Sequence, residues 1–189
     1  MGTETNPCSI ISVVCLQTSD GGISNNNQLL YTSKELPGDM PRFKKLSIGE
    51  TGEINIMGRK NWDSIPEKFR PFGDGRLTIV VSRHDHPEIW REKSCFVAHS
   101  PLEALELAKR LIKRTGLPKN IVIGGGGAIY QALFPYCHKL YTTEVIGDRI
   151  ADVKISIPDY YQLVSRELIR EASPSYSFAE YMNTNVLLC

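Results

Sequence analysis

Four consecutive glycines, Gly124 to Gly127, constrain the fold of this chain more than any other feature. The apolar residues 121–123 before them predict a buried strand, and the spacing of residues 128–134 after them predicts a helix. Glycine loses much backbone entropy on folding, so a run of it indicates backbone that comes close to another group. Amides at the start of a helix bind anions, and a phosphate is therefore one candidate.

The glycine run does not by itself identify a nucleotide site. No Lys-Ser or Lys-Thr pair follows it as in a P-loop. Ile129 stands where a GxGxxG pattern starting at Gly124 needs its last glycine. A tight structural turn explains the run equally well, so the rest of the chain has to decide between the two.

The length, the net charge and the cysteine content are those of an ordinary globular protein. A length of 189 residues fits one domain with its own hydrophobic core. The net charge of +1 argues against partners bound by bulk electrostatics, so we expect no nucleic-acid and no membrane partner. Five widely spaced cysteines do not form a secreted disulfide framework, and residues 1–7 lack the features of a signal peptide. We therefore expect a cytoplasmic protein.

Strands and helices alternate early in the chain, and strands dominate late. Strands are predicted at residues 9–16, 54–57, 77–82, 96–98, 121–123, 139–145, 161–170 and 176–188. Helices are predicted at residues 36–46, 59–65, 101–114 and 128–134, and a long flexible loop at residues 17–27. This order predicts an α/β fold in a single domain, residues 1–189. Its central sheet is mainly parallel with an antiparallel C-terminal edge and helices on both faces.

Asp39 falls on the apolar stripe of the predicted helix 36–46, because Phe43 and Leu46 follow it at i+4 and i+7. A carboxylate on an apolar face costs roughly several kcal/mol unless it is paired or hydrogen-bonded. An acidic residue in a first helical turn also interacts well with the helix dipole, which explains Asp39 without any function. The alternative is a buried group that handles a proton or binds a cationic or amide-bearing ligand.

Two basic pairs lie at the ends of predicted strands. Arg59 and Lys60 follow residues 54–57, and Ser82 and Arg83 close the strand at residues 77–82. The carboxyl ends of parallel strands form the ligand crevice of an α/β sheet. Two arginines there would bracket a phosphate such as a 2′-phosphate, whereas ordinary surface basicity is the alternative.

His84 and His86 have a spacing that some metal sites use. Apart from the nearby Asp85 and Glu88, no cluster of Cys, Asp or Glu completes such a site, so we expect a pair of loop histidines and no metal. The cysteines are expected to pack as small hydrophobic side chains.

Several segments together resemble dihydrofolate reductase, in the order and approximate spacing of that family. They are SIISVVCL, LPGDMPRFK, IMGRKNWDSIP, RPFGDGR, VVSR, GGGAIY, KLYTTEV and SYSF, which together extend over nearly the whole chain. The resemblance implies reduction of the small-molecule substrate 7,8-dihydrofolate by hydride transfer from NADPH. We expect a monomeric protein.

The resemblance implies catalytic roles for Asp39, Thr143 and Tyr31. Asp39 matches the acid that anchors the pterin and promotes protonation of its N5, and Thr143 matches the threonine that hydrogen-bonds this acid. Arg76 matches the arginine that pairs with the glutamate carboxylate of the substrate. The substrate-binding residues that the resemblance implies are Ile11, Ser12, Val13, Leu30, Phe43, Ile65, Arg76, Gly124 and Tyr130.

For the cofactor, Arg59 and Arg83 resemble the clamp on the 2′-phosphate, with Ser82 beside them. Gly125 and Gly126 match two glycines that the family joins by a cis peptide bond. The loop around Ile23 resembles the mobile loop that closes over the nicotinamide. The cofactor-binding residues implied are Val13, Ile23, Ser24, Asn27, Gly58, Arg59, Lys60, Asn61, Val81, Ser82, Arg83, Gly125, Gly126, Gly127, Ala128, Ile129 and Tyr130.

The chain departs from the family pattern near the implied site, at Ser24, Leu30, Tyr31, Asn61 and Gly124. Tyr31 stands where the family usually has Trp, and Gly124 replaces a bulky aliphatic residue and is expected to enlarge the pocket. One alternative is a reductase of related fold that acts on another pterin or pyrimidine, such as the riboflavin-pathway reductase. The other is a binding protein without turnover. Asp39 favours folate over the first alternative and argues against the second.

Overall fold

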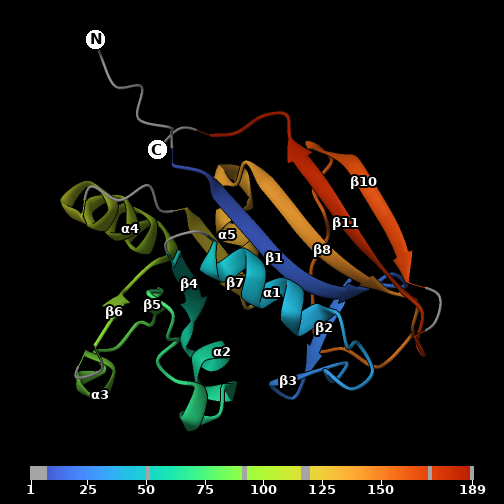
Figure 1. The fold of residues 1–189 in the computed structure, drawn as a ribbon, viewed down its shortest axis with the longest axis horizontal. Helices are drawn as coiled ribbons and strands as arrows, with labels where there is room; N and C mark the ends of the chain where they lie inside the picture. The colour runs from blue at the N-terminus through green and yellow to red at the C-terminus, as the bar shows by residue number, and fades with distance from the viewer. Residues whose placement is uncertain (1–7, 50–51, 91–92, 116–119, 170–171, 188–189) are drawn as a thin grey trace.

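An eight-stranded sheet runs through the molecule (Figure 1). The structure is a computed structural model, and it describes residues 8–49, 52–90, 93–115, 120–169 and 172–187. The strand order is β10-β11-β8-β1-β7-β4-β5-β6. The strands are β1 (Ile10–Gln17), β4 (Ile54–Gly58), β5 (Leu77–Val81), β6 (Cys95–Ala98), β7 (Ile121–Gly125), β8 (Lys139–Val145), β10 (Tyr161–Ile169) and β11 (Tyr176–Asn183). Pairs from β8 to β6 are parallel, and β10 and β11 pair antiparallel, which confirms the predicted parallel sheet with an antiparallel C-terminal edge.

Helices cover both faces of the sheet, as predicted (Figure 1). They are α1 (Asp39–Ile48), α2 (Arg59–Ser64), α3 (Pro87–Trp90), α4 (Pro101–Thr115) and α5 (Gly127–Leu133), with 3-10 turns at Glu67–Phe69 and Phe134–Tyr136. Successive side chains of a strand point to opposite faces. Ile11 and Val13 of β1 accordingly pack with Phe43 of α1, whereas Val14 belongs to the main core with Leu105 of α4.

The ends of several elements differ from the predicted ones by a few residues. The predicted helix 36–46 begins only at Asp39, because Leu36 lies in a preceding turn where its N–H donates to the Thr32 carbonyl oxygen at 3.0 Å. The last strand ends at Asn183, and part of its predicted end lies outside the described residues. The start of α4 is confirmed, since the Ser100 hydroxyl accepts the Glu103 N–H at 3.2 Å.

The expectation of an irregular loop at residues 17–27 was wrong for its second half. β2 (Gly22–Asn25) pairs with β3 (Gln28–Leu29) and with β9 (Val153–Lys154) in a separate three-stranded sheet. The only apolar residue of the segment, Ile23, is buried in the main core. One apolar residue cannot show the alternation that identifies a strand, and the partner strand comes from a distant part of the chain.

The cysteines of the described residues, Cys8, Cys15, Cys95 and Cys137, do not form disulfide bonds. Cys95 and Cys137 are buried, as expected of small hydrophobic side chains, and burial raises the pKa of Cys137 to about 12. Cys189 lies outside the described residues.

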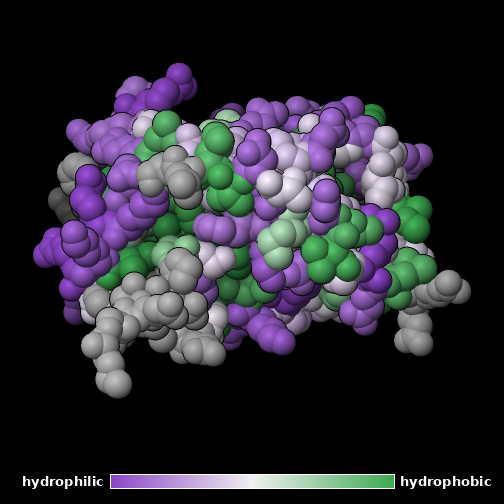
Figure 2. Space-filling view, turned by 90° about the horizontal axis from the view of Figure 1, so that it is seen from above, coloured by the Kyte–Doolittle hydropathy of each residue, from purple (hydrophilic) through white to green (hydrophobic). Residues whose placement is uncertain are grey.

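The surface seen from above is mostly hydrophilic with separate hydrophobic patches (Figure 2). The edge strand β10 contributes exposed apolar side chains at Leu163, Val164 and Leu168. Within the described ranges, the helices are all too short or too polar to cross a bilayer.

Candidate active site

Asp39 is the first residue of α1 and lies against β1 and β8, where Cys15 and Thr143 are paired neighbours. Desolvation raises the pKa of the Asp39 carboxyl, while a hydrogen bond from the Thr143 side chain and the charge of Arg42 oppose the rise. The same burial raises the pKa of the Cys15 thiol, and the negative charge of Asp39 adds to that rise. A carboxyl with a raised pKa in a partly closed site is suited to hold and deliver a proton.

Arg42 stands close to Asp39 in the same helix but uses its guanidinium elsewhere. Its Nη1 donates to the Thr142 carbonyl oxygen at 2.6 Å, and its Nη2 donates to the Ala179 carbonyl oxygen at 3.1 Å. The guanidinium also lies 4.5 Å from the centre of the Phe178 ring. Arg42 therefore fastens α1 to β8 and β11 and holds Asp39 in place over the sheet.

A cavity of about 20 Å³ lies beside Asp39, a volume that holds about one water molecule. Its lining residues are Cys15, Gly22, Ile23, Leu29, Leu30, Tyr31 and Asp39. The Tyr31 hydroxyl donates to Gln17 Oε1 at 3.1 Å, so the tyrosine contributes its ring to the cavity wall. Arg149 stacks on that ring at 4.4 Å and donates to the carbonyl oxygen of Leu30. The structure thus brings Tyr31 and Leu30 to Asp39, while a catalytic role for Tyr31 stays a prediction.

The implied substrate residues on β1 do not all point the same way. Ile11 and Val13 face α1 and contact Phe43, as a pocket wall requires. Ser12 points to the opposite face, where its hydroxyl lies 3.5 Å from the Ile123 carbonyl oxygen. Tyr130 is buried on that face as well, and its hydroxyl donates to the Val13 carbonyl oxygen at 2.8 Å. Ser12 can therefore offer a ligand only its backbone, whereas Tyr130 supports β1 from behind.

An aromatic wall leads from Asp39 toward Arg76. The rings of Phe43 and Phe72 meet edge to face at 6.2 Å, and the Arg76 guanidinium lies 4.5 Å from the centre of the Phe72 ring. Arg76 is buried and donates to Ser47 Oγ at 3.0 Å, which fixes its guanidinium at the end of this wall. A Cβ at Gly124 would lie 4.0 Å from the Phe43 ring, so this position faces the wall and has room for a side chain.

Two strand-to-helix turns meet beside this wall. β4 and β7 are neighbours in the sheet and lead into α2 and α5. The Asn61 side chain donates to the Gly124 carbonyl oxygen at 2.8 Å and ties the two turns together. Neither N-cap, Gly58 nor Gly126, provides a side-chain cap. The first N–H groups of both helices are therefore free of side-chain caps at the edge where an anion would bind.

The two central glycines of the run have different roles. Gly125 and Gly126 are joined by a cis peptide bond, as the resemblance implied. Gly125 has φ +98°, and a Cβ there would lie 2.7 Å from the Tyr130 ring. A Cβ on Gly126 would meet no atom within 4 Å. Gly125 is therefore required by the backbone and its packing, whereas Gly126 leaves an open surface.

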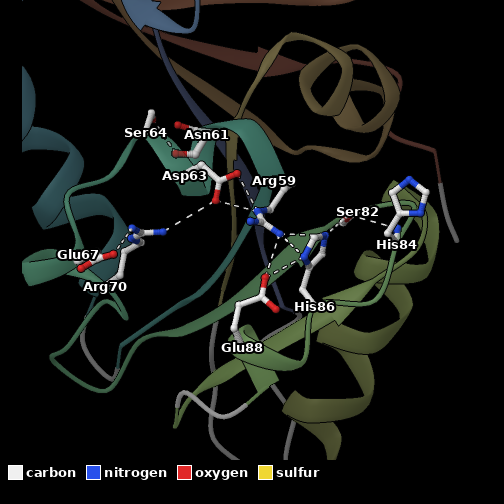
Figure 3. Close-up of polar contacts among 10 residues, drawn as sticks. All are labelled: Arg59, Asn61, Asp63, Ser64, Glu67, Arg70, Ser82, His84, His86 and Glu88. Carbon is white, nitrogen blue, oxygen red and sulfur yellow. Dashed lines mark hydrogen bonds and ion pairs between the residues drawn. The ribbon is translucent and has the colours of Figure 1, made fainter.

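Residues from different segments gather around Arg59 at the neighbouring strand ends (Figure 3). Its Nε donates to the two carboxylate oxygens of Asp63 at 2.7 and 2.8 Å, and its Nη1 donates to Glu88 Oε1 at 3.2 Å. His86 Nε2 lies 2.9 Å from Arg59 Nη1 and 2.8 Å from the Ser82 hydroxyl. The structure thus joins Arg59 and Ser82 in one cluster, as a phosphate site requires.

The other implied cofactor residues are spread around these turns. Lys60, Arg83 and Ala128 are exposed, and Ile129 is buried in the main core. Ile65 packs beside Trp62 under α2. Ser24 lies on β2, and Asn27 lies in the turn that follows it. Val81 packs against the main core, and Gly127 is the buried first residue of α5.

Sequence reasoning missed four residues of the site, namely Cys15, Asp63, His86 and Glu88. The spacing of Asp63 from Arg59, four residues on a predicted helix, was a signal for their ion pair. His86 and Glu88 reach Arg59 from another segment, so only the fold brings them together. The recorded partners of His86 are Ser82, Arg59 and Glu88. The described residues contain no group of three suited to a metal ion.

Comparison with known proteins places this arrangement in a family. The family model described as dihydrofolate reductase matches residues 10–183. The chain is 33% identical over 159 residues to bifunctional dihydrofolate reductase-thymidylate synthase 2 of Arabidopsis thaliana, with 82% of the chain and 27% of that protein covered. It is 35% identical over 138 residues to the bifunctional dihydrofolate reductase-thymidylate synthase of Glycine max, with 70% and 25% covered.

A bacterial relative is covered more fully. The chain is 29% identical over 152 residues to the dihydrofolate reductase of Mycobacterium tuberculosis, with 77% of the chain and 81% of that protein covered. Against the plant proteins, by contrast, the chain spans only about a quarter of the relatives' length.

Proposed function

The chain belongs to the dihydrofolate reductase family, and we propose that it reduces 7,8-dihydrofolate to 5,6,7,8-tetrahydrofolate with NADPH as the hydride donor. Asp39 carries the proposal, because its partly buried carboxyl has a raised pKa, accepts a hydrogen bond from Thr143 and stands at the head of an aromatic wall. We further propose that the protein acts as a single-domain monomer in the cytoplasm, without nucleic-acid or membrane partners.

The strand ends offer features that fit NADPH. The starts of α2 and α5 lack side-chain caps, and Gly126 leaves the surface between them open to a phosphate. Arg59 and Ser82 supply a cation and a hydroxyl for the 2′-phosphate, with Arg83 next in the chain. When bound, NADPH supplies the hydride. The protein holds the phosphates, and Ile23 of β2 lines the neighbouring cavity beside Asp39.

Asp39 supplies the acid side of the reaction. Its carboxyl binds the amide and amino edge of the pterin and promotes protonation of N5. Desolvation favours the protonated carboxyl, and the hydrogen bond from Thr143 fixes its orientation. The adjacent cavity has the volume of one water molecule, which could pass a proton from the carboxyl to a ring nitrogen out of its direct reach.

The aromatic wall holds the rest of the substrate. Phe43 and Ile65 provide apolar contact for the pterin and the aminobenzoate ring. Arg76 pairs with the α-carboxylate of the glutamate tail, because its guanidinium is already fixed by Ser47 and Phe72. Tyr31 and Leu30 close the cavity on the side of Asp39.

An absorbance assay tests the proposal directly. We expect the protein to oxidise NADPH only when dihydrofolate is present, and to use NADH far less efficiently. Arg110→Gln, an exposed change on α4, is a matched control and should retain the parent rate. Absence of dihydrofolate-dependent oxidation would refute the proposed function, and turnover of another pterin in its place would favour the related-fold reductase.

A further inference from the structure

Most of the wall of the small cavity beside Asp39 comes from one segment. Apart from Cys15 and Asp39, the lining residues all lie between positions 22 and 31, on β2, on β3 and just after β3. Tyr31 ends this segment and is buried, although the next three residues, 32–34, are exposed. The Tyr31 ring therefore depends on contacts from another part of the chain to stay in the wall.

Arg149, in the loop between β8 and β9, stacks on the Tyr31 ring. Its half-exposed guanidinium lies 4.4 Å from the centre of the ring. Nη1 donates to the Leu30 carbonyl oxygen, and Nη2 donates to Glu35 Oε1. A planar guanidinium is able to stack on a ring and to donate from two nitrogens at the same time. Arg149 thus joins the residue before Tyr31, the ring itself and a residue beyond it.

Glu35 fixes the position of the Arg149 guanidinium. Its Oε2 accepts hydrogen bonds from the N–H and the hydroxyl of Thr32, each at 2.8 Å, while its Oε1 accepts from Arg149. The hydrogen bond from Arg149, followed by those from Thr32, lowers the pKa of the Glu35 carboxyl to about 2. Glu35 and Arg149 are therefore both charged at neutral pH, and their ion pair does not titrate there.

The backbone of the β8–β9 loop also packs against Tyr31. The buried Gln17 side chain donates from Nε2 to the Arg149 carbonyl oxygen and to Asp20 Oδ1, each at 2.7 Å. Its Oε1 accepts from the Tyr31 hydroxyl at 3.1 Å. A Cβ on Gly147 would lie 2.0 Å from the Tyr31 hydroxyl oxygen, so this loop touches the tyrosine directly. Gln17 therefore holds the Arg149 backbone at a fixed place beside the ring.

The titratable groups around Asp39 are Cys15 on β1, Arg42 on α1, Tyr130 on α5 and, across the cavity, Tyr31. Burial raises the pKa of Cys15, Tyr31 and Tyr130, so these groups are neutral at neutral pH. Desolvation is the largest influence on the pKa of Asp39, so water that passes Tyr31 would change this pKa strongly. The charged groups around the Tyr31 side chain are Glu35, Asp148 and Arg149.

We propose that Arg149 is a positioning residue that holds the Tyr31 ring in the cavity wall and so keeps bulk water away from the Asp39 carboxyl, with Glu35 orienting its guanidinium. Arg149 acts on Asp39 through Tyr31, because its guanidinium contacts the tyrosine ring and the chain on both sides of it. This inference rests on the proposed function for the reaction that Asp39 serves, but one of its tests needs no turnover.

Arg149→Gln removes the guanidinium and tests this role through the pH profile of kcat. Water that enters past a loosened Tyr31 favours the ionised form of Asp39, so the pKa falls and the decline of kcat with rising pH moves to lower pH. Loss of the positive charge by itself would have the opposite effect, because a nearby cation stabilises a carboxylate. The direction of the shift therefore separates a positioning role from a charge effect.

The same variant should change kcat and not KM. We expect kcat at neutral pH to fall by about threefold to tenfold, because the cavity beside the acid is no longer closed. KM for dihydrofolate should change by less than about twofold, since the wall of Phe43, Phe72 and Arg76 is built on other elements and stays intact.

A double variant shows whether Arg149 acts through Tyr31. The ring is already absent in the Tyr31→Ala background, so Arg149→Gln should lower kcat there by less than about a further twofold. If Arg149 only supported the fold as a whole, Arg149→Gln would lower kcat by the same factor in both backgrounds.

Urea unfolding measures the solvation of Asp39 without any turnover. At pH 8, the difference in unfolding free energy between the parent and Asp39→Asn reports the cost of burying the ionised Asp39 carboxyl. The corresponding difference between Arg149→Gln and the double variant Arg149→Gln/Asp39→Asn should be about half as large, because water reaches the carboxyl.

Lys139→Gln is the matched control for the loss of an ion pair. Lys139 pairs with Glu180 at 2.7 Å, and the two side chains are 35% and 25% exposed, against 46% and 27% for Arg149 and Glu35. This pair lies on β8 and β11, away from residues 22–31. Lys139→Gln should therefore retain the kcat and the pH profile of the parent.

The outcomes separate this inference from the proposed function. A pH profile of Arg149→Gln that stays in place or moves to higher pH overturns the inference, as does an equal effect of this change in the Tyr31→Ala background. A parent protein that reduces dihydrofolate, with an unfolding difference that Arg149→Gln leaves unchanged, overturns this inference alone. A parent without turnover, in which Arg149→Gln still reduces the unfolding difference, overturns the proposed function alone.

Discussion

The two ends of the proposed site hold charge in opposite ways. At the substrate end, Asp39 is partly buried and desolvated, and its partners reduce but do not cancel the rise of its pKa. At the phosphate end, Arg59 is paired with Asp63 and Glu88, and the three side chains are 30%, 46% and 59% exposed. A single desolvated carboxyl has a shifted pKa and is therefore suited to proton transfer. Exposed ion pairs contribute little to the free energy of folding, and we expect this one to select the cofactor.

The packing around each end explains this difference. Asp39 begins a helix next to a buried cluster, whose members are Leu30, Tyr31, Leu36, Val145 and Tyr176. The phosphate cluster lies on a short helix and a loop at the rim of the sheet (Figure 3). We therefore expect salt to weaken the function of the phosphate end and to leave the substrate end almost unaffected.

Asp39→Asn gives the strongest test of this contrast. An amide cannot supply a proton, so kcat should fall by about 10²- to 10³-fold at pH 7 to 8, within the usual range for loss of a general acid. The rate of NADPH oxidation, measured from pH 5 to pH 9, should partly recover at low pH, where solvent can protonate the pterin. NADPH affinity, as the control, should not change, and a pH profile like that of the parent would contradict the role of Asp39.

The same variant makes a prediction about stability. A raised folded-state pKa means that the native protein holds the Asp39 proton more tightly than the unfolded chain does. Its stabilising contribution is therefore present at low pH and is lost as the pH rises through the folded pKa. Urea unfolding should show Asp39→Asn to be more stable than the parent by about 0.5–2 kcal/mol at pH 8, with a smaller gap at pH 5. A gap independent of pH would show that Asp39 is not desolvated.

Substitutions of Gly125 and Gly126, which lie between the two ends of the site, distinguish an effect on packing from an effect on cofactor binding. Gly125→Ala would place a Cβ 2.7 Å from the Tyr130 ring at a positive φ, and we expect a loss of about 2–3 kcal/mol of unfolding free energy. Gly126→Ala, its matched control, meets no atom and should change stability by less than about 0.5 kcal/mol. Gly126→Ala should instead weaken NADPH binding. Equal thermal stability of the two variants would contradict the requirement for glycine at position 125.

The sequence predicted the fold more completely than the site. The long apolar strands and the capped helix 101–114 were visible because each carries a local pattern. β2 was not, because Ile23 is its only apolar residue and β9 its distant partner. Asp39 was singled out from helical spacing alone, whereas the contacts of His86 and Glu88 with Arg59 depend on the folded chain and left no pattern in the sequence.

The Arg59→Gln variant measures how much the exposed phosphate end contributes to NADPH binding. We expect NADPH affinity to fall by about tenfold, because one charge-assisted contact to the 2′-phosphate is lost. NADH affinity should stay the same, and the loss should shrink as salt is added. Lys60→Gln removes the same charge one residue away and should have a smaller effect on NADPH. Equal losses for the two cofactors in Arg59→Gln would mean that Arg59 acts on the shape of α2 and not on the phosphate.

Tyr31→Phe should have the smallest effect on kcat and on stability. It tests whether the Tyr31 hydroxyl takes part in the reaction at the substrate end. The change removes the hydroxyl that donates to Gln17 at 3.1 Å, but it retains the ring that lines the cavity and stacks against Arg149. Burial raises the pKa of the Tyr31 phenol, so this group does not titrate in the range of the assay. We expect a stability loss of about 0.5–1.5 kcal/mol and a change in kcat below about threefold.

Tyr31→Ala is the matched comparison, because it removes the ring as well and opens the cavity beside Asp39 to solvent. Its kcat should fall further than that of Tyr31→Phe, and its pH profile should shift to lower pH because a solvated Asp39 loses part of its raised pKa. A large loss of kcat already in Tyr31→Phe would place the hydroxyl on the proton path. Asp39 would then share its role with a second polar group, and the substrate end would no longer depend on one desolvated charge.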